Sequence, residues 1–374
     1  MGLTSVPREK PVTMREHIDR RTFVAGATGA ALTGLTGCLG GSGGDSAETH
    51  VGMVYSLGGL GDEAFNDMAH AGVQKAEEEL GIAYDNTEPE GQSEFGTFQS
   101  QFASSSDPNY DLVTCIGFSQ RSALQENAEE YPDQNFMLVD AGLDADNVAS
   151  YRFREHEGSF QVGHLAGLLS TREFSHEGSY SGSEKTFSSD PETKTVGFVG
   201  GKENPLIKKF EAGFIAGVHH ADADIEVRSA YAGSWNDPGR GQEIAGSMYD
   251  EGADIVYHAA GATGSGVFNA AGERGRLAIG VDSDQSLSSD ASHTIVASMV
   301  KHVDTAVFNA TKDVVNDEFK GGSTVSLGLE DGGVEAVIGA DYEGEIPQEV
   351  LDALDSSREA IQNGDIDVPT EPEN

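Results

Sequence analysis

An internal repeat restricts the possible folds of this chain more than any other feature. Segments of the first half return in the second half in the same order, and the offset between copies changes by no more than three residues over four landmarks. The matching segments are 51–54 with 196–199 and 71–73 with 216–218 (offset 145), 111–113 with 254–256 (offset 143), and 139–140 with 281–282 (offset 142). Such a nearly constant offset indicates a duplicated structural unit.

Each copy alternates short apolar runs with amphipathic stretches, the pattern of strand–helix–strand units around a parallel sheet. We therefore predict an α/β protein with two doubly wound lobes. The predicted boundaries are 50–160 for the N-terminal lobe, 161–300 for the C-terminal lobe, and 301–374 for a return segment and C-terminal helix that complete the lobes. Residues 175–193, rich in Ser, Glu, Gly and Asp, predict an acidic loop insertion, and residues 324–329 and 334–338 a final pair of strands.

Two aspartates end equivalent strands of the predicted repeat. Ligands of open α/β sheets collect beyond the carboxyl ends of the strands, so two facing lobes predict one interlobe cleft. Asp140 and Asp282 are expected to face each other across it. Carboxylates there could accept hydrogen bonds from the hydroxyls of a neutral sugar or act in acid–base catalysis, and the residues alone leave both open.

Two aromatic residues are expected to border the same cleft. Phe65 follows a glycine turn after the first strand, and Trp235, the only tryptophan, precedes a turn that opens a helix. One aromatic ring on each lobe could hold a flat ring between them. Phe65 fits a core position as well as a binding position, whereas the polar neighbours of Trp235 favour binding.

The motifs of several enzyme and cofactor classes are incomplete. The glycines at 58–61 lack dinucleotide-binding spacing, and the segment 261–266 lacks the lysine of a phosphate-binding loop. His156-Glu157 cannot begin a two-histidine zinc motif because Phe160 occupies the position that the second histidine would need. We predict no metal and no cofactor.

The net charge excludes one class of partner. The chain has 63 Asp and Glu against 23 Lys and Arg, a formal charge of −40, which repels nucleic acid and anionic lipid heads. Charge spread along every segment is typical of a surface in concentrated salt, as expected of a halophilic archaeon.

The N-terminus resembles an export signal. Arg20-Arg21 precedes a short, weakly apolar stretch, which indicates a twin-arginine signal peptide over residues 1–37. The stretch ends in Leu35-Thr36-Gly37-Cys38, which resembles a lipobox in which Cys38 carries the lipid, and residues 38–49 form a Gly/Ser linker. The other cysteine, Cys115, lies in an apolar run and is expected in the core.

Taken together, eight motifs resemble those of the basic membrane protein (BMP) family of lipoproteins, which includes purine nucleoside receptors. They lie at 58–66, 139–140, 153–160, 212–218, 233–238, 260–268, 279–285 and 298–301. The resemblance implies a type I periplasmic-binding-protein fold that closes on its ligand by a hinge motion.

The resemblance also implies roles for particular residues. The aromatics matching Phe65 and Trp235 stack on the base, and the aspartate matching Asp282 holds ribose hydroxyls. Further positions implied for the pocket are Asp140, Gly261 and Lys301, with Asp62 and Asn66 in its first loop. Two positions depart from the family pattern. Ser56 replaces an aspartate that contacts the base, and His70 replaces a bulky aromatic residue.

We therefore predict the substrate-binding lipoprotein of an ABC importer, not an enzyme. It would be a monomer, lipid-anchored on the outer face of the membrane, that captures a nucleoside, preferably a purine, for a permease and its ATPase subunits. The same fold could instead bind riboflavin or a simple sugar. A more distant alternative is a nucleoside-processing enzyme.

Overall fold

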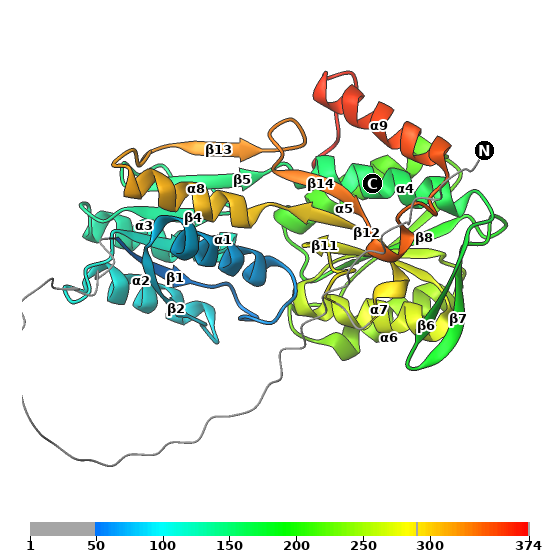
Figure 1. Cartoon of the computed structure of the whole chain (residues 1–374), viewed down its shortest axis with the longest axis horizontal. Coiled ribbons are helices and arrows are strands. Elements are labelled where there is room, and N and C mark those ends of the chain that lie inside the picture. The colour runs from blue at the N-terminus through cyan, green and yellow to red at the C-terminus, as the bar shows by residue number, and fades with distance from the viewer. Residues whose placement is uncertain (1–48, 289–290, 373–374) are drawn as a thin grey trace, which may run out of the picture. The chain divides into compact units, whose positions relative to one another are not determined.

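The computed structural model describes residues 49–288 and 291–372, and their central feature is a pair of six-stranded sheets. The first sheet has the order β13-β5-β4-β3-β1-β2 and is parallel throughout (Figure 1). Its strands are β1 (His50–Val54), β2 (Ala83–Thr87), β3 (Leu112–Cys115), β4 (Phe136–Val139), β5 (Val148–Phe153) and β13 (Thr324–Leu327). The predicted parallel sheet is confirmed.

The second sheet repeats this order as β14-β12-β11-β10-β8-β9, with only β14 antiparallel to its neighbour. Its strands are β8 (Thr195–Gly200), β9 (Glu226–Tyr231), β10 (Ile255–Ala259), β11 (Leu277–Asp282), β12 (Ile295–Lys301) and β14 (Val334–Ile338). Every residue of β8, β10, β11 and β12 is buried, as expected for parallel strands covered on both faces. The duplicated sequence thus folds into two lobes of the same strand order, and the predicted fold class is correct.

Helices cover both faces of each sheet. In the first lobe, α1 (Phe65–Leu80) packs with α8 (Val303–Val315) on one face, and α2 (Phe95–Ala103) with α3 (Arg121–Glu130) on the other. In the second lobe, α4 (Glu155–Ser170) packs with α5 (Pro205–Ala221), and α6 (Pro238–Asp250) with α7 (Ser265–Arg274). The C-terminal helix α9 (Gln348–Gln362) lies against α4. None of the helices in the described ranges is long and apolar enough to cross a membrane.

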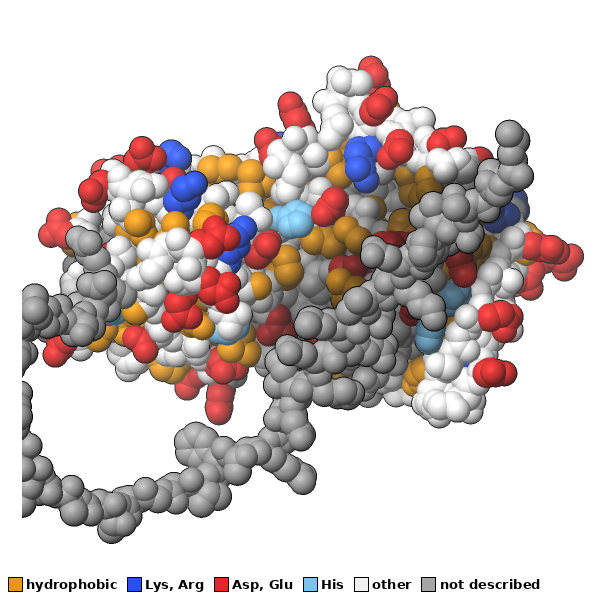
Figure 2. Space-filling view, in the orientation of Figure 1, with side chains coloured by type: hydrophobic (Ala, Val, Ile, Leu, Met, Phe, Trp, Pro, Cys, Tyr) orange, Lys and Arg blue, Asp and Glu red, His pale blue; other side chains and the backbone are white. Residues whose placement is uncertain are grey.

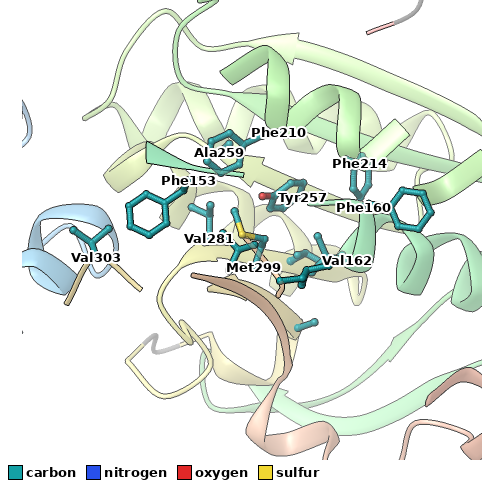
Figure 3. Packing of buried hydrophobic residues seen from close by; sticks show 14 of the residues in the cluster. Phe153, Phe160, Val162, Phe210, Phe214, Tyr257, Ala259, Val281, Met299 and Val303 are labelled. Atoms are coloured by element: carbon teal, nitrogen blue, oxygen red, sulfur yellow. The ribbon is translucent and has the colours of Figure 1, made fainter. Parts of the chain in front are cut away.

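One hydrophobic cluster connects the lobes. Phe153 at the end of β5 and Val303 at the start of α8 belong to the same buried cluster as Phe210 and Met299 of the second lobe (Figure 3). The Tyr257 and Phe214 rings, 5.2 Å apart between centroids, continue this cluster under α5. The core therefore surrounds the segments at which the chain crosses between lobes.

The chain crosses between the lobes three times, and the first crossing corrects one predicted boundary. The first crossing lies between β5 and α4, so the predicted boundary at 160/161 falls inside α4, a helix that packs on α5 and β12 of the second lobe. After the second crossing, α8 and β13 join the first lobe, and after the third, β14 and α9 join the second. Both final strands predicted at 324–329 and 334–338 are present, and β13 pairs with β5 whereas β14 pairs with β12. β13 is therefore an edge strand of the first sheet, and β14 is an edge strand of the second.

The predicted loop at 175–193 is instead a hairpin. Its strands β6 (Ser175–Tyr180) and β7 (Ser183–Ser188) are antiparallel and joined by Ser181 and Gly182, both with positive φ, as two-residue hairpin turns require. Phe187 is fully buried, and this anchor outweighs the polar composition that suggested a loop. Cys115 is buried, as predicted. The signal peptide, Cys38 and all but the last residue of the linker lie outside the described residues.

Candidate functional site

A cavity lies between the lobes at the carboxyl ends of the parallel strands. It contains about 840 Å³ of empty space, including its opening to solvent, within the size range of small-molecule sites. All nine ligand-binding residues predicted from the sequence line it: Ser56, Asp62, Phe65, Asn66, Asp140, Trp235, Gly261, Asp282 and Lys301. Residues separated by up to 245 positions (301 − 56) therefore meet in one cavity.

The two strand-end aspartates have the same unusual backbone. Asp140 follows β4 and Asp282 ends β11, and each has a φ of +64°, the left-handed conformation. Aspartate tolerates this conformation better than most residues, and such outliers persist where the surrounding structure holds them. The duplicated turn brings one carboxylate from each lobe to the inner end of the cavity.

Lys301, at the end of β12, connects these carboxylates. Its Nζ lies 2.9 Å from Asp140 Oδ2 and 3.4 Å from Asp282 Oδ1. The three side chains are 2%, 3% and 10% exposed for Lys301, Asp140 and Asp282 respectively, so their attraction is little screened. The pair Lys301–Asp140 joins the second lobe to the first.

The pKa values in this cluster favour a charged lysine. Burial by itself lowers the pKa of Lys301, but Asp140, Asp282 and Glu155 outweigh burial and raise it above its ordinary value. Burial raises the pKa of Asp282, and the charge of Lys301 partly offsets that rise. Asp140 Oδ1 accepts no hydrogen bond from the described residues, so the cluster retains capacity to accept a ligand hydroxyl.

Glu155 is a charged neighbour that the sequence analysis missed. This first residue of α4 is fully buried and lies 3.2 Å from Lys209 Nζ. Burial, followed by the charge of Asp140, raises its pKa. It does not line the cavity, so its contribution there is electrostatic. In the sequence, only its position within the motif at 153–160 could have indicated that Glu155 contributes to the site.

The two aromatic residues form parts of opposite cavity walls. Both are partly exposed, and each also packs on the hydrophobic core, so neither is an interior residue. The Phe65 ring centroid lies 4.4 Å from Lys301 Nζ, within cation–π range. Trp235 lies across the turn after β8, where a Cβ on Gly201 would be 2.3 Å from its ring.

Thr263 holds the loop that carries Trp235. Its backbone N–H donates to the Trp235 carbonyl (3.2 Å), and its hydroxyl accepts from the Asp237 N–H (2.9 Å) and donates to the Ser234 carbonyl (3.2 Å). Thr263 is fully buried. It is a positioning residue that the sequence analysis did not identify, because its partners become neighbours only through folding.

Asp62 and Asn66 organise the first loop. Asp62 Oδ1 accepts from the Ala64 and Asp67 N–H groups, and its Oδ2 from the backbone and side-chain N–H groups of Asn66. Burial raises the pKa of Asp62 to about 6 despite the backbone donors, which lower it. Asn66 in turn accepts from the Ser56 N–H and donates to the Gly59 carbonyl. Both residues line the cavity, but their polar atoms are largely used within the loop.

Two glycines allow the backbone to approach other residues closely at the cavity. Gly117 (φ +106°) and Gly261 (φ +57°) follow equivalent strands. A Cβ on Gly117 would lie 3.0 Å from Ser56 Oγ, and one on Gly261 would lie 3.2 Å from the Trp235 carbonyl oxygen. Cavity residues that the sequence analysis missed include Gln92, Phe118, Ser119, Lys202, Ile207 and Phe210.

His70, which departs from the family pattern, does not line the cavity. Its Nδ1 lies 2.5 Å from the Tyr55 hydroxyl, on the helix side of β1. No group of three or more His, Cys, Asp and Glu side chains within 49–288 and 291–372 has the arrangement of a metal site.

Comparison with known proteins identifies the family. Residues 49–371 match the family described as "ABC transporter substrate-binding protein PnrA-like" (Bmp). The "ABC transporter nucleoside-binding protein BmpA" of Lactococcus lactis is 30% identical over 379 residues, covering 96% of this chain and all of that protein. An "uncharacterized lipoprotein" of Pyrococcus abyssi is 32% identical over 302 residues, covering 78% of this chain and 69% of the relative.

A solved structure supports the same assignment. An ABC transporter solute-binding protein of Aeropyrum pernix superposes with a TM-score of 0.74 at 29% identity, over 87% of this chain and 94% of that one. Members of this family bind solutes and do not catalyse reactions, so the alternative of a nucleoside-processing enzyme is set aside. The chain belongs to the PnrA-like (Bmp) family of substrate-binding proteins of ABC transporters.

Proposed function

We propose that this protein captures a nucleoside, preferably a purine nucleoside, between its lobes and delivers it to a membrane permease coupled to ATPase subunits. The observation that carries the proposal is the division of the cavity into two chemically different parts. The inner part holds the Asp140–Lys301–Asp282 cluster, and Phe65 and Trp235 border the rest. The name of the Lactococcus relative supports the same ligand class.

The inner cluster suits ribose hydroxyls. Carboxylate oxygens accept hydrogen bonds from hydroxyl groups, and the lysine ammonium donates to hydroxyl oxygens. Because Lys301 already balances part of the negative charge, a neutral sugar can bind there without bringing a counter-charge. The aromatic residues suit a flat base, and stacking contributes about 0.5–1.5 kcal/mol beyond buried area.

Isothermal titration of the full chain in molar salt tests the proposal. We expect heat on adding inosine, guanosine or adenosine, and none on adding ribose or free base alone at the same concentration. Binding of riboflavin or a simple sugar in place of nucleosides would establish the alternative ligand. The absence of heat and of a thermal shift with every nucleoside would refute the proposal.

We also propose that the protein is a lipid-anchored monomer on the outer face of the cell membrane. Arg20-Arg21 and Cys38 support export by the twin-arginine route, cleavage after residue 37 and acylation, and relatives named lipoproteins support an anchor. Cys38→Ser should release the protein into the medium, and Arg20→Lys with Arg21→Lys should stop its export. Fractionation with mass spectrometry of the N-terminal peptide distinguishes these outcomes.

The surface supports adaptation to high salt. Acidic side chains are spread over the visible described face, and basic ones are few (Figure 2). At molar salt the Debye length is about 3 Å, so the mutual repulsion of these carboxylates is screened. Circular dichroism should show unfolding when salt is removed, and gel filtration in molar salt should show a monomer.

A further inference from the structure

Lys202 places an ammonium group without a partner among the described residues at the mouth of the ligand cavity. It lines both the main cavity and a second, outer cavity. Three other residues line both cavities: Leu57, Gly58 and Trp235. Within residues 49–288 and 291–372, its Nζ has no hydrogen-bond or ion-pair partner. Among the described residues that line the main cavity, the one other lysine is Lys301, which is held by two carboxylates.

The backbone places Lys202 beside the aromatic wall. It follows Gly201, against which the Trp235 ring lies. The hydroxyl-binding cluster around Lys301 is deeply buried, whereas Trp235 borders both the main and the outer cavity. A ligand whose hydroxyls reach Lys301 and whose ring meets Trp235 therefore presents the outer edge of that ring to Lys202.

The remaining polar groups near the ring do not distinguish donors from acceptors. Ser56, Ser119 and Gln92 line the cavity, and hydroxyl and amide groups both donate and accept. The Asp62 oxygens accept four N–H groups within the first loop. A lysine ammonium, in contrast, has three donors and no acceptor. Among the described residues that line the main cavity at this edge, Lys202 is thus the charged group that only donates, whereas Glu88 and Glu90 line the outer cavity alone.

We propose that Lys202 is a specificity-determining residue that selects nucleosides with a carbonyl group, rather than an amino group, on the outer edge of the base. The inference rests on the proposed nucleoside-binding function. A carbonyl oxygen accepts a hydrogen bond from the ammonium group, whereas an exocyclic amine would direct its own hydrogens at that cation. A ligand without the carbonyl leaves the ammonium donor without an acceptor in the complex, and this unpaired donor lowers its affinity.

Three nucleosides test the proposal; they differ in the group on carbon 6 and in the hydrogen that only inosine carries on N1. Inosine has a carbonyl at the 6-position, adenosine has an amine, and purine riboside has only hydrogen. Titration of the full chain should show inosine binding about tenfold more tightly than the other two, the size expected for one hydrogen bond to a charged group. Lys202→Met should remove this preference by weakening inosine about tenfold, with purine riboside unchanged. Lys202→Arg should retain the preference.

Lys208→Met is the matched control. Lys208 lies on α5, pairs with Glu203 at 2.9 Å and does not line the cavity, so the same loss of charge there should leave all three affinities unchanged. Thermal melting of each variant without ligand checks that the fold is retained.

The outcomes separate the two proposals. Equal weakening of all three ligands by Lys202→Met would show that Lys202 acts by pairing with Glu88 or Glu90 of the opposite lobe on closure, and would overturn the specificity role. An unchanged preference for inosine would overturn it as well. If wild-type protein binds none of the three, the proposed function fails; if it binds them with equal affinity, only the inference fails.

Discussion

Gly201→Ala tests whether the position of Trp235 creates the aromatic part of the cavity. An added Cβ would lie 2.3 Å and 2.4 Å from two ring carbons of Trp235, and 3.1 Å from the Ala260 Cα. Restoring an ordinary carbon–carbon distance of about 3.5 Å requires the ring to move by about 1.2 Å (3.5 − 2.3). The partly exposed ring must move away from the turn behind it, toward the main and outer cavities that it borders.

The expected effect is larger on binding than on stability. Overpacking a closed core costs about 1–3 kcal/mol, but here the indole can shift, so we expect the free energy of unfolding to fall by about 1 kcal/mol or less. A ring displaced by about 1 Å narrows the space for the base and loses most of the stacking contribution. Nucleoside affinity should therefore fall about fivefold to tenfold, or about 1–1.4 kcal/mol.

A double-mutant cycle measured by titration identifies the cause. Trp235→Ala alone should weaken binding by about 1–3 kcal/mol, and adding Gly201→Ala to it should have almost no further effect, because the clashing ring is gone. Gly239→Ala is the control, since a Cβ there meets only Asp237 Oδ1 at 3.5 Å, an ordinary contact. Wild-type affinity in Gly201→Ala, or additive losses in the double variant, would refute this account of Trp235.

Two further predictions concern charged groups. Asp282→Asn removes one charge beside Lys301 while keeping a side chain that tolerates φ of +64°, and should weaken nucleoside binding about tenfold or more in titrations; Asp317→Asn, also at positive φ (+58°) but outside the cavity, should not. An equal effect of both variants would contradict a direct role for Asp282. The contact with Asp304, an ion pair at 3.5 Å, and then the hydrogen bond with Glu335 raise the pKa of His302 above its ordinary value. The stabilising effect of His302 is therefore present below about pH 6.5 and is lost as pH rises through the raised pKa. His302→Gln should thus lower the free energy of unfolding more at about pH 5.5 than at about pH 8.5, by less than about 1 kcal/mol, and equal denaturant midpoint shifts at both pH values would contradict this.

The repeat and the strand ends made much of the fold and site predictable. In a parallel sheet every strand ends at the same edge, so a residue that follows an apolar run can be assigned to that edge from the sequence alone. Asp140, Asp282 and Lys301 were placed in this way or by family resemblance, and the structure brings an oxygen of each carboxylate within 3.4 Å of Lys301 Nζ. Residues with no such local signal, such as Thr263 and Glu155, were missed.

The errors have a common origin in packing between distant segments. Composition suggested a loop at 175–193, but Phe187 reaches the core and anchors a hairpin there. The edge strands β2 and β9 were not identified because their residues are half-exposed and polar. The strands β13 and β14 were both predicted, but their positions in the sequence did not show that they extend different sheets.

The sequence by itself determined the two-lobe α/β fold through its periodicity and repeat offset. It also determined the family and nine of the residues that line the cavity, through the strand ends and the resemblance of its motifs. Only the tertiary structure decided which lobe each crossing segment joins, that Asp62 and Asn66 spend most of their hydrogen bonds on their own loop, and that Trp235 lies against Gly201 beside Lys202. These facts depend on the free energy of contacts between segments far apart in the chain. Such contacts form only when the chain folds and both lobes pack around one core.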